Sequence, residues 1–141
     1  MIRTTLATLG LTLALTAPAL ADGNRITLDQ WGSWNETGLH QGGRHNDLSV
    51  TQQGFANSVI AAQDGHRNLT TIGQAGSGNG VVASQGGACN VLGVAQFGAG
   101  NGADVAQGGR CNALGVIQTG HGGVVVARQS GRGNVAVIVQ N

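Results

Sequence analysis

Cysteine and histidine carry the most reactive side chains in this 141-residue sequence. Cys89 and Cys111 lie 22 residues apart, and the four histidines are His40, His45, His66 and His121. Such residues can form a disulfide, bind a metal ion or transfer protons. A zinc site built on Cys89, Cys111 and His45 lacks a fourth ligand, and no nucleophile has a general base beside it. We therefore expect no catalytic site, no metal site and no cofactor, and predict that the protein is not an enzyme.

Glutamine side chains form a second group with binding capacity, because each carboxamide both donates and accepts hydrogen bonds. Gln recurs every eleven residues without a slip, and only Gln53 lies outside the series. The members are Gln30, Gln41, Gln52, Gln63, Gln74, Gln85, Gln96, Gln107, Gln118, Gln129 and Gln140. This spacing divides the chain into units of constant length.

Each unit has two further fixed positions. The second residue after Gln is always Gly: Gly32, Gly43, Gly54, Gly65, Gly76, Gly87, Gly98, Gly109, Gly120 and Gly131. The fifth is Asn in nine of ten units, with Gly123 as the exception, and Asn24 opens the series. The asparagines are Asn24, Asn35, Asn46, Asn57, Asn68, Asn79, Asn90, Asn101, Asn112 and Asn134. A seven-residue segment from Asn to Gln thus alternates with a four-residue connector.

The seven-residue segments are predicted to be β-strands. The residues two and four places after Asn are mostly apolar, as Leu48 and Val50 are after Asn46, while Thr37 and Thr70 are polar. A side-chain period of two places Asn, these two residues and Gln on one inner face. The connector Gly indicates a turn with positive φ. The sequence therefore predicts an all-β, two-sheet parallel β-solenoid of eleven short strands with 22-residue coils and cross-β stacking.

Stacked coils would place equivalent residues about 4.8 Å apart. The Gln and Asn columns would then form amide ladders, with each side chain bonded to the copies above and below. Cys89 and Cys111 occupy the same connector position one coil apart, so they could form a disulfide if their Cβ directions allow it.

The N-terminus predicts secretion. Residues 1–21 contain one Arg, an apolar run and a small-residue Ala19-Leu20-Ala21 end, which is typical of a signal peptide. Residues 22–141 would form the solenoid domain. With seven Lys and Arg against six Asp and Glu, the chain lacks the basic footprint of a nucleic-acid-binding protein.

The repeat resembles that of the curlin family, the subunits of bacterial curli amyloid fibres. The stretch NSVIAAQDGHRNLTTIGQ, from Asn57 to Gln74, matches the family repeat at every named position. The resemblance implies a protein exported through the periplasm and an outer-membrane apparatus, which assembles with other curlin subunits into cell-surface fibres (pili) for adhesion and biofilm formation. The family's major subunit has an export segment before the first repeat, and this chain lacks an appreciable one.

The ends of the repeat array predict self-association into fibres. The first strand would begin at Asn24 and the last would end at Gln140, which leaves both coil ends without polar caps. The connectors also predict a basic edge that could attract anionic surfaces or polysaccharide. The alternative function is a soluble β-solenoid that binds ice or glycans. Ice binding would need an outer threonine array, whereas the outer positions hold only Thr27, Thr51 and Thr71.

Overall fold

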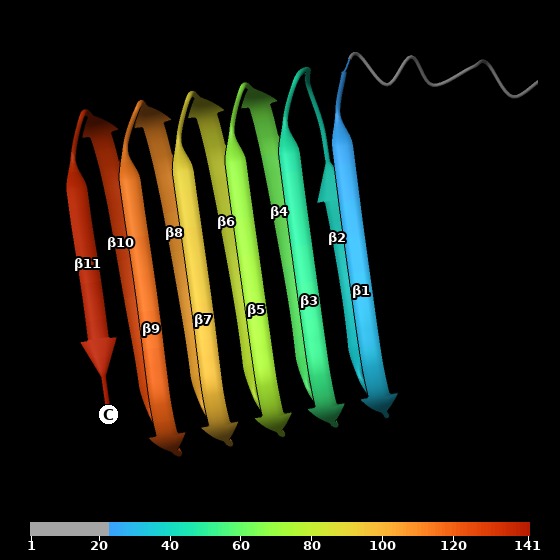
Figure 1. The fold of residues 1–141 in the computed structure, drawn as a ribbon. Helices are drawn as coiled ribbons and strands as arrows, with labels where there is room; N and C mark the ends of the chain where they lie inside the picture. The colour runs from blue at the N-terminus through green and yellow to red at the C-terminus, as the bar shows by residue number, and fades with distance from the viewer. Residues whose placement is uncertain (1–22) are drawn as a thin grey trace, which may run out of the picture.

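The computed structural model describes residues 23–141, which form a flattened solenoid of parallel strands (Figure 1). The strands are β1 (Arg25–Ser33), β2 (Glu36–Gln41), β3 (Asp47–Phe55), β4 (Ser58–His66), β5 (Leu69–Ser77), β6 (Gly80–Ala88), β7 (Val91–Ala99), β8 (Gly102–Arg110), β9 (Ala113–His121), β10 (Val124–Arg132) and β11 (Val135–Gln140). The predicted signal peptide lies outside the described residues. Within those residues, no helix is long and apolar enough to cross a membrane.

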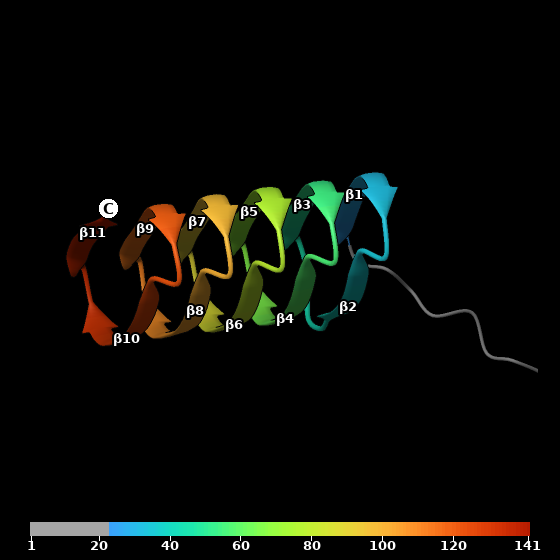
Figure 2. The same cartoon turned by 90° about the horizontal axis from the view of Figure 1, so that it is seen from below.

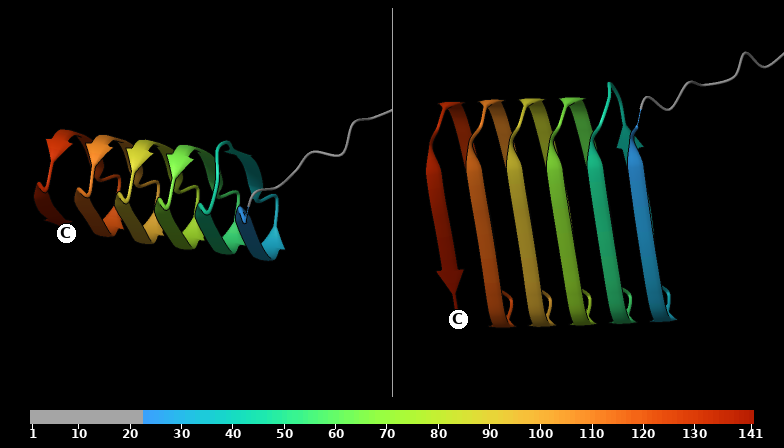
Figure 3. Two further views of the ribbon diagram at one scale, coloured as in Figure 1. Left: turned by 90° about the horizontal axis from the view of Figure 1, so that it is seen from above. Right: turned by 45° about the horizontal axis from the view of Figure 1, so that its top comes forward.

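The strands alternate between two sheets. The odd-numbered strands form a six-stranded sheet and the even-numbered strands a five-stranded sheet. Each residue pairs with the residue 22 positions further on, as Gln52 does with Gln74. Figures 2 and 3 show the two layers and the steady advance of the coils along one axis. The predicted solenoid of eleven parallel strands and 22-residue coils is confirmed.

The core is one thin apolar layer between the sheets. It is formed by the two inward positions of the middle strands: Leu48, Val50, Val59, Ala61, Ile72, Val81, Ala83, Leu92, Val94, Ala103, Val105, Leu114, Val116, Val125 and Ala127. Ile26 and Leu28 occupy inward positions of β1 but remain 47% and 44% exposed. They lie in the first coil, where the described residues supply a neighbouring coil on one side only.

Nine of the eleven strands extend further than the seven-residue segments expected from the sequence, and β2 and β11 have six residues. β3 begins after Asn46 and continues past Gln52 through Gly54 to Phe55. All of these residues stay paired with β5, including Gly54 with Gly76. Because every connector has the same length, equivalent connector residues stack just as the strand residues do. Most of nine of the ten connectors therefore remains part of the ladder, with a corner of two residues, whereas five residues separate β2 from β3.

Candidate functional site

The glutamine side chains form continuous hydrogen-bonded columns inside each sheet. Nine bonds of 2.6–3.0 Å run from the Nε2 of one Gln to the Oε1 of the Gln 22 residues later. The members from Gln52 to Gln118 are buried. Among the described residues, no buried side-chain nitrogen or oxygen lacks a partner. The ladder therefore offsets the cost of placing amides beside an apolar core.

The Gln ladder has a direction, because in every bond the Nε2 of one Gln donates to the Gln nearer the C-terminal end. The second Nε2 hydrogen of Gln52 is donated to the backbone oxygen of Glu36 on the opposite sheet, at 3.2 Å. Gln63, Gln74, Gln96 and Gln118 make the equivalent bond. Reversing one of these amides would place its oxygen against a backbone oxygen, and two acceptors cannot bond to each other. Contacts across the core thus hold the column of the six-stranded sheet in one orientation, and in the five-stranded sheet Gln63 makes the same contact.

The two threonines at inward positions connect the Gln columns to the opposite sheet. Thr70 and the backbone oxygen of Asp47 share the second Nε2 hydrogen of Gln63, each at 3.2 Å, and Thr70 donates to the Oε1 of Gln85 at 3.0 Å. Thr37 bridges Gln30 and Gln52 in the same way, with both bonds at 2.6 Å. These hydroxyls are satisfied members of the amide network, a role that the sequence pattern did not indicate.

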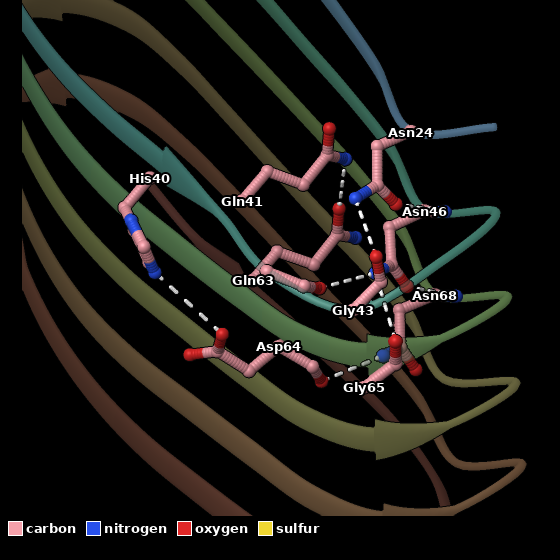
Figure 4. Close-up of polar contacts among 10 residues, drawn as sticks. Asn24, His40, Gln41, Gly43, Asn46, Gln63, Asp64, Gly65 and Asn68 are labelled. Atoms are coloured by element: carbon pink, nitrogen blue, oxygen red, sulfur yellow. Dashed lines mark hydrogen bonds and ion pairs between the residues drawn. The ribbon is translucent and has the colours of Figure 1, made fainter. Parts of the chain in front are cut away.

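The asparagine column differs from the side-chain ladder that we expected. Asn46 donates to the backbone oxygens of Gly42 at 2.7 Å and Gly65 at 3.0 Å, and its Oδ1 accepts the backbone N–H of Asn68 at 3.0 Å. Figure 4 shows Asn24, Asn46 and Asn68 beside the corner glycines, with the Gln41–Gln63 pair further inside.

Direct bonds between Asn side chains join only some members, such as Asn57 and Asn35 at 3.1 Å. The Asn side chain is one methylene shorter than that of Gln and lies beside the corner, where backbone groups need partners. The Asn side chains therefore mainly hydrogen-bond to backbone groups of the corners, while the Gln side chains link one coil to the next by bonding to one another.

The corner conformation involves two residues with positive φ. All ten connector glycines have φ between 84° and 124°. A Cβ on Gly54 would overlap the carbonyl oxygen of Gly76 in the next coil. The residue before Asn is the second such position, and the mixed residue types in that column did not indicate it. It is left-handed with φ of 52–69°, and six of its occupants are not glycine: Trp34, His45, Ala56, Arg67, Cys89 and Cys111.

The cysteines at this second position are joined. Cys89 and Cys111 form a disulfide between stacked corners, with their Cα atoms 4.6 Å apart. The histidines do not gather into a site, and the described residues contain no group of three or more His, Cys, Asp or Glu that could hold a metal ion. His40 lies on the outer surface, with its Nε2 3.6 Å from Asp64 Oδ1.

Both ends of the described solenoid have strands that pair on one side only. These are β1 and β2 at one end and β10 and β11 at the other. Leu48 is fully buried, whereas Ile26 at the equivalent position of the first coil is half exposed. At the other end, Val135, Val137 and Val139 are each more than 60% exposed on the outer face. The concentration of unpaired backbone and apolar surface at these ends makes them the candidate functional sites.

Comparison with known proteins supports the resemblance to the curlin family. Residues 21–54 match the family model of the curlin associated repeat. This match confirms the curlin-repeat resemblance over those residues. No curated protein matches the chain. Residues 21–54 thus carry a curlin-type repeat, and the solenoid continues with the same 22-residue coils through the rest of the described residues.

Proposed function

We propose that this protein polymerises head-to-tail into an extracellular, curli-like amyloid fibre that supports cell adhesion and biofilm structure. The single observation that carries the proposal is the open, in-register edge of β1 and β2 at one end and of β10 and β11 at the other. Each end presents unpaired strand backbone and an interrupted Gln column. A second copy stacked end to end would continue both, and such a contact does not close on itself.

The direction of the Gln ladder supports a head-to-tail arrangement. At the N-terminal end, Gln30 and Gln41 donate inward, so their outward Oε1 atoms can accept a bond from another copy. At the C-terminal end, Gln129 and Gln140 accept from the preceding coil, and within the described residues their Nε2 groups donate to no other side chain. Donors would meet acceptors in head-to-tail stacking, whereas two like ends would oppose donors to donors or acceptors to acceptors. Each copy would add about 26 Å of fibre axis, from five and a half coils at about 4.8 Å.

The proposal includes export. Residues 1–21 would act as a signal peptide, and the mature chain would reach the cell surface through the periplasm and an outer-membrane apparatus, together with other curlin subunits. The curlin repeat match is consistent with this route. We expect an antibody that cannot enter intact cells to label the mature chain on their surface, and retention inside the cells would contradict this part of the proposal.

Incubation of the purified mature chain tests the central proposal. We expect fibres that bind thioflavin T and give a reflection near 4.7 Å along the fibre axis. Sonicated fibres should seed fresh monomer and remove the lag phase. A chain that remains a folded monomer at high concentration, with or without seeds, would contradict the proposal and favour a soluble β-solenoid binding module.

A further inference from the structure

The corners of the solenoid separate basic from aromatic side chains. Corners that follow even-numbered strands lie along one edge, at the top of Figure 1, and those that follow odd-numbered strands lie along the other. The first edge, which we call the basic edge, carries Arg44, His45, His66, Arg67, Arg110 and Arg132. The second, the aromatic edge, carries Trp31, Trp34, Phe55 and Phe97, each more than half exposed. These four are all the aromatic residues of the chain.

The basic edge contains a registered column of side chains. The backbone of Arg44 forms a β-bridge with that of His66, and His66 pairs in register with Ala88. The same column continues through Arg110 to Arg132. Successive members are therefore about one coil, or roughly 4.8 Å, apart. Arg67 lies in the neighbouring corner column, and its backbone N–H donates to Arg44 at 3.2 Å. The Cys89–Cys111 disulfide fixes the central corners. The positive charges thus stand on a rigid backbone, which reduces the entropy lost on binding.

Within the described residues, no salt bridge neutralises the arginines of this edge. The described residues contain one ion pair, Arg128–Asp104, and one contact between His40 and Asp64, and both lie on the outer face of the five-stranded sheet. Neither includes Arg44, Arg67, Arg110 or Arg132, all of which are exposed. The edge therefore presents a linear array of cations although the net charge of the whole chain is only +1.

We propose that the basic edge binds a linear acidic polysaccharide. The carboxylates of this polymer would contact the arginines of the edge, which are Arg44, Arg67, Arg110 and Arg132. A flexible polymer with charges along its length can occupy several arginines at once, so weak individual contacts add up to useful avidity. The edge is present in each single subunit. A fibre would repeat it, so assembly should strengthen this binding without being required for it.

The separation of the two edges favours a polysaccharide over other polyanions. Proteins that bind single-stranded nucleic acid combine a basic track with aromatic side chains that stack on bases. Here the aromatic residues lie on the opposite edge, so one strand cannot use both. Peripheral membrane binding usually joins basic residues to large apolar side chains that enter the lipid, and the corners of the basic edge carry none. A carboxylate-bearing glycan needs only the cations.

Binding to a polyuronate, sodium alginate, tests this proposal. We expect the mature chain to bind alginate in a salt-dependent manner, and to bind neutral dextran of matched length at least about tenfold more weakly. Substituting Arg110→Gln together with Arg132→Gln should weaken alginate binding about tenfold. Neither residue has a positive φ, so Gln can occupy both positions without backbone strain. The matched control, Arg25→Gln with Arg128→Gln, removes the same charge from the sheet faces and should bind alginate within about twofold of wild type.

Three results would overturn the proposal: equal weakening by the two double variants, equal binding of dextran, or tighter binding of poly-dT or of phosphatidylserine vesicles than of alginate. All variants should first show the same parallel-β infrared signal as wild type. The binding assay is run on monomer and on fibres. A chain that does not polymerise but binds alginate through Arg110 and Arg132 would contradict the proposed function and support this inference. A chain that forms fibres but does not bind alginate through these residues would support the proposed function and contradict this inference.

Discussion

At the scale of single residues, the connector glycines and the inward amides have roles that no other residue type can fill. The connector glycine combines a positive φ with direct contact to the backbone of the next coil. The inward Gln uses both hydrogens and the oxygen of its carboxamide, as Gln52 does toward Gln74, Glu36 and Gln30. Glycines on the outer faces of the strands, such as Gly93, have open space where a Cβ would lie.

The contrast between two glycines of β7 gives a direct test. Gly98 has a φ of 121°, and a Cβ there would overlap the oxygen of Gly120. Gly98→Ala should lower the free energy of unfolding by about 2–5 kcal/mol, from backbone strain and the enforced shift of the next coil. Gly93 has open space at its Cβ position, so Gly93→Ala should change stability by less than about 1 kcal/mol. Urea unfolding of fresh monomer measures both, and equal effects would refute this account of the corner.

At the scale of strands and corners, stability comes from repetition. Each middle strand pairs with two neighbours of the same length, and the corners stack as regularly as the strands. The Asn side chains satisfy corner backbone groups, so the polar groups of a turn need not reach solvent. The disulfide reinforces this arrangement at one place, where it links the corner after β6 to the corner after β8.

Removal of the disulfide should destabilise the solenoid without changing its fold. Cys89→Ser together with Cys111→Ser removes a link between residues 22 positions apart, and the expected loss is about 2–4 kcal/mol. Serine keeps the size of the side chain at both left-handed positions. Wild type treated with a reductant should unfold at the same urea concentration as the double variant. If reduction has no effect on the wild-type midpoint, the disulfide does not stabilise the protein.

At the scale of the whole molecule, the solenoid is polar along its axis. The Gln donors point toward the C-terminal end throughout, and the outward-facing valines gather in β10 and β11. Arg25, Glu36 and Asp47 occupy outer positions near the other end. The two ends therefore differ in hydrogen-bonding capacity and in surface chemistry, which favours one mode of stacking between copies.

A single substitution at the C-terminal end can test this polarity. Gln140→Glu keeps an oxygen that accepts the bond from Gln118, but replaces the outward-facing amine with a second oxygen. Fibre elongation at pH 7 should slow about tenfold, because an acceptor would then face the outward Oε1 of the next copy. Below about pH 4 the carboxyl group is protonated, can donate again, and elongation should recover.

The control for that experiment is Gln53→Glu, which adds the same charge at the exposed glutamine that lies outside the ladder. It should elongate nearly as wild type does at both pH values. Equal slowing by the two variants would show that net charge alone governs elongation and would contradict the polar ladder as its cause.

The coil length, the assignment of strands to alternate sheets and the inward face were all predictable from the amino-acid sequence. A spacing of eleven residues, maintained from Gln30 to Gln140, makes equivalent residues stack and leaves little choice of topology. The connector Gly was also predictable, because a positive φ and a tight backbone contact exclude other residues. These features follow from local conformational preference repeated at a constant period.

The way in which the side chains share their hydrogen bonds became visible only in the folded structure. The preference of Asn46 for corner backbone, the bridges made by Thr70 and the single direction of the Gln ladder depend on distances across the core and between coils. The joining of Cys89 to Cys111 likewise depends on the left-handed backbone of two stacked corners. A one-dimensional period specifies which residues stack, but it does not specify where their polar atoms point.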